Sequence, residues 1–362
     1  MGKKKNSIKK LVFGKKESRA VLKVNPTVPP QRPLPLNAKV DVFTYSRESF
    51  SFERISNVST LKKPENELNI SWINIYGLSK EEVETVSSIF GIHSLITEDI
   101  LSIGQRPKMD DLNNLLFCLL NMLFYNEESC TVDPEQISIV LGKNFVLTFQ
   151  EEGERDVFSV VRDKIKVPGS KIRLNRADFL FYSILDAIVD HYFVVMEKLG
   201  DNIETLEDEI LRFSNKESLG KINDMRKEMI VLKRNIAPVR EMISSIIRSD
   251  SEMIAENTEK YFKDVYDHII QANDLSENYR DLLINLQDLY LNNVNLRLNE
   301  VMKVIAIVTC LMAPAAVIGG IFGMNFDRIP LLHNQWGFYI SVAIMLLVPV
   351  AMVIIFKKRG WF

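Results

Sequence analysis

Two long runs of apolar residues dominate the hydropathy pattern of the chain. Residues 304–322 read VIAIVTCLMAPAAVIGGIF and residues 336–356 read WGFYISVAIMLLVPVAMVIIF, and neither run contains a charged side chain. Helices of 19 and 21 residues span about 28–32 Å, close to the roughly 30 Å thickness of a bilayer's hydrocarbon core. The pattern therefore predicts two transmembrane helices, because a pair of such charge-free runs is unusual in a soluble core.

The region before these runs shows a mixed pattern and then a helical one. Short β-branched and aromatic runs predict strands at 40–45, 70–75, 137–141 and 145–149, and polar-apolar periodicity predicts helices at 80–90 and 154–166. From about Ala177 turn residues become sparse, and acid-rich and Lys-rich helical stretches run through 185–248. We therefore expect a cytoplasmic α+β domain with a helical extension over 37–250.

A long helix is expected to lead into the first apolar run. Asp250 and Ser251 are suitable N-cap residues, and no strong breaker follows them before that run. Apolar residues recur at heptad-like steps, at Val265, Ile269, Ala272, Tyr279, Leu282, Leu286 and Leu289. A single helix over 251–325 would be about 110 Å long. Because a monomer cannot bury a rod of that length alone, we infer a homo-oligomer whose stalk helices pack together.

Polar and small residues follow one face of this expected stalk and span. At heptad spacing the face carries Asp288, Asn292, Asn295, Asn299, Met302, Ala306, Thr309, Ala313, Ala316 and Gly320. Such a stripe either lines a water-filled axis or lets two helices approach closely, and the spacing alone leaves both interpretations open. The recurring asparagines favour a pore, because rings of polar side chains around an axis can serve hydrated ions.

The distribution of charge predicts the orientation in the membrane. Arg297 and Lys303 precede the first span, and Lys357, Lys358 and Arg359 follow the second. The positive-inside rule then places both termini in the cytoplasm and the loop 326–335 outside, as expected of a multi-pass plasma-membrane protein. Residues 1–36 are basic and proline-rich and are expected to form a disordered tail. The net charge of −2 does not suit a general nucleic-acid binder.

A short motif lies directly after the first span. Gly323, Met324 and Asn325 form the tripeptide GMN, and the second span follows a short loop. Two terminal spans joined in this way resemble the CorA family of divalent-cation channels, which import Mg²⁺. Other segments also resemble that family, namely EDIL at 98–101, QRPK at 105–108, DAIVD at 186–190, YFKDVYDH at 261–268 and NEVMKV at 299–304. The likeness covers about residues 40–362.

The resemblance implies an architecture and an ion path. It implies a funnel-shaped homopentamer. In each subunit the α+β cytoplasmic domain would be followed by a very long stalk helix that continues into a two-helix transmembrane domain. The second span would be 336–356 and the basic C-terminus 357–362. Gly323, Met324 and Asn325 would form the selectivity filter. Asn299 and Met302 would line the inner constriction, Asp288 would ring the cytoplasmic entrance, and Lys357, Lys358 and Arg359 would form a basic collar around it.

The resemblance also implies regulatory metal sites. Asp99 of one subunit and Asp264 of its neighbour would bind Mg²⁺ between cytoplasmic domains, with Glu98, Asp186 and His268 as ligands of a second site. The chain departs from the family pattern at Phe322, where tyrosine is common before GMN. It also has Ala313 and Ala316 where bulkier or hydroxyl-bearing residues are often found on the pore face.

The expected function is passive, membrane-potential-driven Mg²⁺ uptake that intracellular Mg²⁺ shuts off. Two alternatives stay open from the sequence: a transition-metal transporter of the same fold, moving Zn²⁺, Co²⁺ or Ni²⁺ and sometimes exporting it, and a membrane-anchored coiled-coil scaffold without a pore. No catalytic constellation and no G-x-x-x-x-G-K-[ST] phosphate loop stands out, so neither an enzyme nor an ATP-driven pump is expected. The expected partners are further copies of the chain, the lipid bilayer and divalent metal ions.

Overall fold

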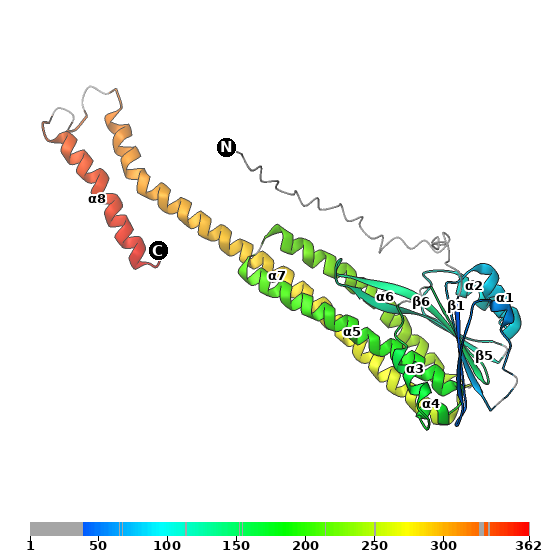
Figure 1. Cartoon of the computed structure of the whole chain (residues 1–362). Coiled ribbons are helices and arrows are strands. Elements are labelled where there is room, and N and C mark those ends of the chain that lie inside the picture. The colour runs from blue at the N-terminus through cyan, green and yellow to red at the C-terminus, as the bar shows by residue number, and fades with distance from the viewer. Residues whose placement is uncertain are drawn as a thin grey trace, which may run out of the picture. The chain divides into compact units, whose positions relative to one another are not determined.

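The structure is a computed structural model that describes residues 39–361, except 65, 67, 113, 152, 154, 214, 250, 326–328, 332 and 333. The tail predicted at 1–36 and part of the predicted external loop lie outside the described residues. Within the described residues the chain contains both strands and helices up to about residue 170 and is helical afterwards (Figure 1).

One mixed sheet organises the first part of the chain. Its strands within the described residues are β1 (Lys39–Tyr45), β2 (Phe50–Ile55), β3 (Ile70–Tyr76), β4 (Lys108–Leu112), β5 (Leu115–Asn126), β6 (Thr131–Leu141) and β7 (Phe145–Gln150), in the order β2-β1-β3-β7-β6-β5-β4. β3 and β7 pair in parallel, and the other neighbours pair antiparallel. The strands predicted at 40–45, 70–75 and 145–149 are confirmed, and β6 begins earlier than predicted.

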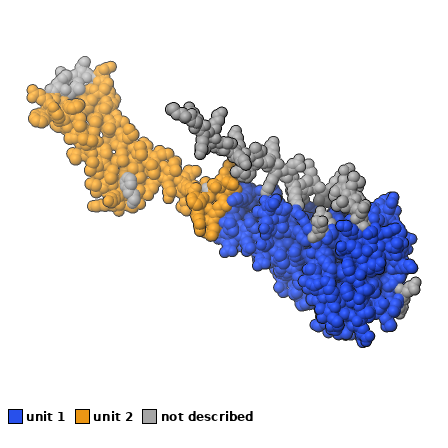
Figure 2. Space-filling view, in the orientation of Figure 1, with its two compact units in different colours: residues 1–207, 220–284 blue, residues 208–219, 285–362 orange. Residues whose placement is uncertain are grey.

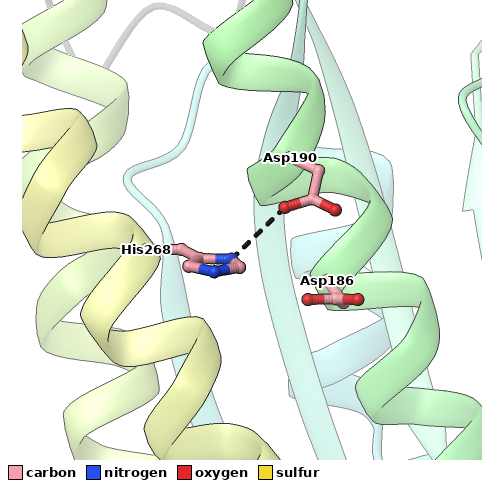
Figure 3. A group of neighbouring side chains, drawn as sticks. All are labelled: Asp186, Asp190 and His268. Carbon is pink, nitrogen blue, oxygen red and sulfur yellow. Dashed lines mark ion pairs between the residues drawn. The ribbon is translucent and has the colours of Figure 1, made fainter.

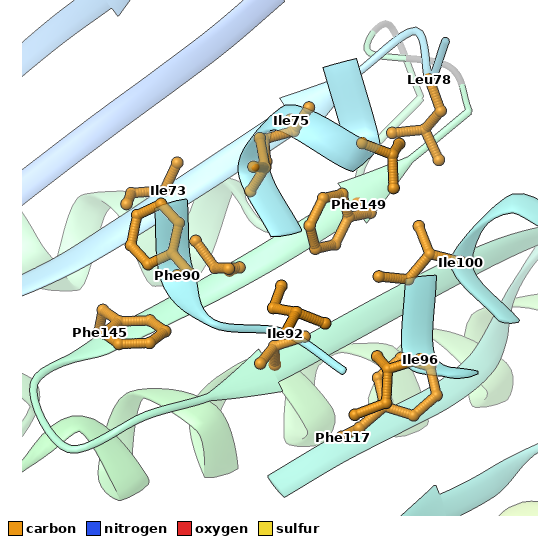
Figure 4. Close-up of a cluster of buried hydrophobic side chains, with 14 of the residues drawn as sticks. Ile73, Ile75, Leu78, Phe90, Ile92, Ile96, Ile100, Phe117, Phe145 and Phe149 are labelled. Carbon is orange, nitrogen blue, oxygen red and sulfur yellow. The ribbon is translucent and has the colours of Figure 1, made fainter. Parts of the chain in front are cut away.

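The alternation of side chains along the central strands separates the two faces of the sheet. Ile73 and Ile75 of β3 lie on the face that α1 (Lys80–Phe90) and α2 (Ser94–Leu101) cover, and they share one buried cluster with Phe90 and Ile100 of those helices (Figure 4). α1 has the start predicted from the sequence, because Ser79 caps it and hydrogen-bonds with Glu82. The first helical layer is therefore fixed by apolar packing.

The opposite face of the sheet packs against the longer helices α5 (Ala177–Arg212) and α6 (Lys216–Arg248) (Figure 1). The Tyr192 hydroxyl donates a 2.6 Å hydrogen bond to the carbonyl oxygen of Asn121 in β5. The Asn121 amide in turn donates at 2.7 Å to Asn235 of α6. Two short helices, α3 (Ser159–Lys166) and α4 (Lys171–Leu174), precede α5. α3 corresponds to the helix predicted at 154–166 but begins five residues later.

The stalk helix α7 (Glu256–Phe322) begins later than the predicted Ser251. The buried carboxylate of Asp178 accepts the backbone N–H groups of Ala255 at 2.8 Å and of Phe179 at 2.9 Å, so it caps the chain entering α7 from the start of α5. The helix ends at Phe322 and has 67 residues, fewer than the predicted 251–325.

One face of α7 is buried in the helical bundle. The residues are Phe262, Val265, Ile269, Ala272, Ser276, Leu283 and Leu286. Leu282, predicted on this face, is instead 44% exposed, whereas Leu283 is completely buried. The prediction was wrong at this position because the heptad that runs through Phe262, Ile269 and Ser276 reaches Leu283.

Three helices within the described residues are long and apolar enough to cross a bilayer, namely α5, α7 and α8 (Gly337–Lys358). The apolar window of α5 is 56% buried, but those of α7 and α8 are only 6% buried. Apolar surface that the chain does not itself cover needs another apolar environment. α7 and α8 are therefore the candidate spans, and α5 belongs to the core around the sheet.

The chain divides into two compact units (Figure 2). Unit 1, up to residue 207 and over 220–284, contains the sheet and most of the helical bundle. Unit 2 contains residues 208–219, at the turn between α5 and α6, and residues 285–362, with the C-terminal part of α7 and all of α8. Within unit 2 the Asn293 amide donates a 3.1 Å hydrogen bond to the Ile210 carbonyl oxygen and so joins that turn to α7.

Candidate ion path and metal sites

The apolar part of α7 has one face that is covered within the chain. Ile307 is buried, and Leu311, Pro314, Ile318 and Phe322 are half-buried, at helical steps of three and four. On α8 the least exposed positions recur with the same periodicity, at Gly337, Ser341, Met345, Pro349, Met352 and Phe356. Because the two sets recur with the same spacing, we infer that α7 and α8 pack along these faces.

The predicted polar and small-residue stripe lies on the other side of α7. With about 100° of rotation per residue, Ala306, Thr309, Ala313, Ala316 and Gly320 lie roughly opposite the face that Ile307, Leu311 and Ile318 occupy. All ten stripe residues, from Asp288 to Gly320, are exposed. The Thr309 hydroxyl donates to the Ile305 carbonyl oxygen at 2.8 Å. The stripe is thus the face of the span that α8 leaves free.

The GMN tripeptide follows directly after the end of α7. The Gly323 N–H donates to the Gly319 carbonyl oxygen at 3.0 Å, and the Met324 N–H donates to Ile321 at 3.3 Å. Gly323, Met324 and Asn325 are all exposed, and the next three residues lie outside the described part of the chain. Asn325 therefore lies exposed just beyond the Gly320 end of the stripe.

The residues predicted to form a basic collar lie at the C-terminal end of α8. Lys357, Lys358 and Arg359 are exposed. Gly360 has a φ of +72°, the Gly360 N–H donates to Lys357, and the Trp361 N–H donates to Phe356, which together make a Schellman motif. The Trp361 ring stacks on Phe356 with centroids 5.1 Å apart. The motif fixes three positive charges beside the carbonyl end of the helix dipole, where cations are favoured.

A second group of candidate ligands lies between α5 and α7 in unit 1. Asp186, Asp190 and His268 offer ligand atoms that all lie within 4.8 Å of one another (Figure 3). His268 Nδ1 lies 3.3 Å from Oδ1 of Asp190, and this buried nitrogen has no hydrogen-bond partner among the described residues. Two carboxylates and an unbonded imidazole nitrogen suit a divalent cation. The sequence analysis named Asp186 and His268 as ligands but not Asp190, although the four-residue spacing within DAIVD placed both aspartates on one helix face.

The surroundings of this cluster disfavour the ionised form of Asp186. Burial and the negative charge of Asp190 raise the pKa of Asp186, and His268, Tyr182 and Lys164 only partly offset them. The Tyr182 hydroxyl donates to Asp186 at 3.3 Å. A bound cation would relieve the repulsion between the two carboxylates.

Asp99, Glu98 and Asp264 occupy separate places in the chain. Asp99 and Glu98 lie at the end of α2, on one side of the sheet, and Asp264 lies exposed on α7, in the bundle on the other side (Figure 1). The Asp99 carboxylate is paired with the Lys108 ammonium at 2.5 Å. A single chain therefore does not bring Asp99 and Asp264 together, so a site that uses both requires a second subunit.

The sequence matches known proteins over most of its length. Residues 67–358 match the family model described as CorA-like Mg2+ transporter protein. The cobalt/magnesium transport protein CorA of Thermotoga maritima is 40% identical over 324 residues, which is 89% of this chain and 92% of that protein. The protein of the same name from Methanocaldococcus jannaschii is 26% identical over 291 residues, or 80% of this chain and 90% of that one.

The fold also matches solved structures. The complete structure of the CorA magnesium transporter from Methanocaldococcus jannaschii covers 91% of this chain and 100% of its own, with a TM-score of 0.73 and 24% identity. The cytoplasmic domain of ZntB from Vibrio parahaemolyticus covers 70% of this chain and 98% of its own, with a TM-score of 0.52 and 17% identity. The predicted sequence of α/β domain, long helix and apolar C-terminal helices is thereby confirmed. The chain belongs to the CorA-like Mg²⁺ transporter family, whose members are membrane ion transporters and not enzymes.

Proposed function

We propose that this protein is a homo-oligomeric channel that lets Mg²⁺ enter the cell passively. The observation that carries the proposal is the position of the polar and small-residue stripe, which lies on the side of α7 opposite the face that packs against α8. Small side chains in an apolar span leave room around a shared axis, and a polar one such as Thr309 is costly toward lipid and useful toward water. Copies of α7 arranged around such an axis would bury the stripe in a pore. The number five rests on the resemblance to the CorA family.

The chemistry of Mg²⁺ explains why amides suit the mouth of this path. Mg²⁺ gives up its water shell reluctantly and demands near-octahedral oxygen contacts when it does. A ring of Asn325 amides can hydrogen-bond the outer face of the hydrated ion and still release it. Carboxylates at the same place would hold the ion and slow conduction. We therefore assign selection of the ion to Gly323, Met324 and Asn325.

The membrane potential would supply the driving force. Moving one charge inward through 100 mV yields about 2.3 kcal/mol, so a divalent ion gains roughly 4.6 kcal/mol. This direction requires the GMN end outside and the basic collar of Lys357, Lys358 and Arg359 inside. The positive residues that flank the spans support the same orientation.

Intracellular Mg²⁺ would close the channel by bridging neighbouring cytoplasmic domains. Asp99 and Asp264 lie on different sides of the sheet in one chain, so the two can meet only across a subunit boundary. Paired carboxylates repel each other when the site is empty and attract the same ion when it is filled. A cell rich in Mg²⁺ would then hold the domains together, and a depleted cell would loosen them.

One observation supports transition metals as additional ions. His268 contributes a nitrogen ligand to the cluster with Asp186 and Asp190, and imidazole prefers Co²⁺, Ni²⁺ or Zn²⁺ over Mg²⁺. The relative from Thermotoga maritima is named a cobalt/magnesium transport protein. We propose that Co²⁺ or Ni²⁺ can occupy this cluster and also be transported.

Ion flux into liposomes tests the proposed function. With an inside-negative potential, vesicles that contain the full chain should take up Mg²⁺, and hexaammine cobalt, a mimic of hydrated Mg²⁺, should block uptake. Asn325→Ala should abolish the block and the selectivity for Mg²⁺, and Asp264→Ala should keep uptake active at high internal Mg²⁺. Vesicles that stay impermeable to divalent ions would favour a scaffold instead, and Zn²⁺ flux without Mg²⁺ flux would favour the transition-metal alternative.

A further inference from the structure

The Asp99 carboxylate, which is proposed to bind regulatory Mg²⁺, already forms an ion pair with the Lys108 ammonium. Nζ of Lys108 lies 2.5 Å from Oδ2 of Asp99. Both side chains are partly accessible, with 36% of the lysine side chain and 17% of the aspartate side chain exposed. This contact joins the end of α2 to the first residue of β4 within one subunit.

The Asp99 side of this pair is held in place by the sheet. Gln136 of β6, which is almost completely buried, donates from Nε2 to the carbonyl oxygens of Ser102 at 2.7 Å and of Asp99 at 3.4 Å. Its Oε1 accepts the Gly104 N–H at 3.1 Å. One side chain thus fixes the backbone on both sides of the turn that follows α2. The backbone that carries Asp99 is therefore held, and the longer side chain of Lys108 has the greater freedom to rearrange.

The Lys108 side of the pair is free to move. Lysine is a flexible point charge with a long stem, and this one also lies 3.5 Å from Oδ2 of Asp110. The Asp110 side chain is 41% exposed. Lys108 can therefore leave Asp99 and keep a carboxylate partner on its own strand.

We infer that Lys108 is a built-in competitor for Mg²⁺ at Asp99 and sets the Mg²⁺ concentration at which the channel closes. An ion on Oδ2 would have to displace the ammonium, and an ion on Oδ1 would lie close enough to be strongly repelled by it. Binding of Mg²⁺ is thus an exchange in which Lys108 moves toward Asp110. The inference rests on the proposed role of Asp99, and it adds a residue that controls the sensitivity of that site.

Hydrogen–deuterium exchange on the full-length protein in lipid nanodiscs tests this inference without relying on transport. The measurement is the Mg²⁺ concentration that gives half-maximal protection of residues 94–112. Lys108→Met should lower this concentration about three- to fivefold, the effect expected when a partly exposed ion pair no longer competes. Lys80→Met is the matched control. Lys80 lies on the same α1–α2 surface as Glu98, but it pairs with Glu84 at 3.7 Å, so its loss should leave the concentration unchanged.

A double mutant separates the inference from the proposed site. If Asp99 binds Mg²⁺, Asp99→Asn should weaken protection, and adding Lys108→Met to it should change nothing further. Wild-type protection in Asp99→Asn would overturn both the proposed site and the inference. If Asp99→Asn weakens protection but Lys108→Met behaves like Lys80→Met, or weakens Mg²⁺ binding, only the role of Lys108 is overturned.

Discussion

The carbonyl oxygen of Leu331 lies where a side chain at position 337 would have to begin. A Cβ atom on Gly337 would be 2.0 Å from that oxygen and 3.1 Å from its carbon. The Gly337 N–H also donates to the Asn334 carbonyl oxygen at 3.0 Å. The glycine therefore lets the chain between the spans return tightly onto the start of α8.

Gly337→Ala should disturb this return. The backbone at Leu331 has to move, and overpacking of this kind costs about 1–3 kcal/mol. We expect a lower thermal midpoint of the assembled protein in detergent and slower Mg²⁺ uptake into liposomes. Gly220→Ala in α6 is the control, because nothing lies within 4 Å of the added Cβ there. Equal midpoints for the two variants would mean that the contact with Leu331 is not retained in solution.

Two alanines in one turn of α7 distinguish a pore face from a lipid face. Ala313 lies on the stripe, and Ala315 lies some 200° away and nearer the side of α8. Ala313→Leu should reduce the initial rate of Mg²⁺ uptake by at least about tenfold, which corresponds to ~1.4 kcal/mol on the barrier to conduction. The reason is that each subunit adds a bulky apolar group to a narrow water-filled pore. Ala315→Leu should conduct normally. Equal rates in the two variants would mean that Ala313 faces lipid and not a pore.

The parts of the fold that could be predicted have clear local signals. β1, β3 and β7 are short β-branched runs between turn residues, and α1 has the capping pair Ser79 and Glu82. β5 was missed because LLFCLLNMLFYN is nearly all apolar and is buried on both faces for most of its length, so it shows no alternation. Periodicity alone cannot distinguish such a strand from a buried helix.

In the candidate sites, too, features that depend on one helix could be predicted, and features that depend on contacts between distant segments could not. The stripe could be predicted because it depends only on the rotation of one helix. The pairing of Asp99 with Lys108 could not, since it depends on how the turn after α2 is fixed by Gln136 from a strand more than thirty residues later. Asp190 joins Asp186 and His268 in the candidate cluster because α7 brings His268 against α5, and linear spacing does not reveal that contact between helices.

Gly360→Ala should loosen the basic collar. An L-residue at a φ of +72° costs about 1–2 kcal/mol, which disfavours the Schellman motif and the stacking of Trp361 on Phe356. We expect quenching of Trp361 fluorescence by a water-soluble quencher to increase, measured in a variant whose other tryptophans are replaced by phenylalanine. Gly360→Asn, which tolerates a positive φ better, should have an intermediate effect. If alanine and glycine give the same quenching, the motif does not hold the collar.

Asp186→Asn should stabilise the cytoplasmic unit in the absence of divalent ions. Since burial and Asp190 raise the pKa of Asp186 above its ordinary value of 3.8, the folded state binds this proton more tightly than the unfolded state. Ionised Asp186 therefore destabilises the fold at neutral pH, and this destabilisation is lost as the pH falls through the raised pKa. The amide removes the charge, and the thermal midpoint at pH 7 should rise by about 1–3 °C and depend less on pH between 7 and 4.

The response to metal gives the same substitution a second, opposite effect. Ions that bind the folded state at 100 times their Kd add about 2.7 kcal/mol of stability. Co²⁺ should therefore raise the midpoint of the wild type clearly, and that of Asp186→Asn much less, because one of three ligands is gone. Asp267→Asn, an exposed neighbour of His268 outside the cluster, should respond like the wild type. An equal gain from Co²⁺ in all three proteins would show that the metal binds elsewhere, and that the crowding of Asp186 and Asp190 serves no ion.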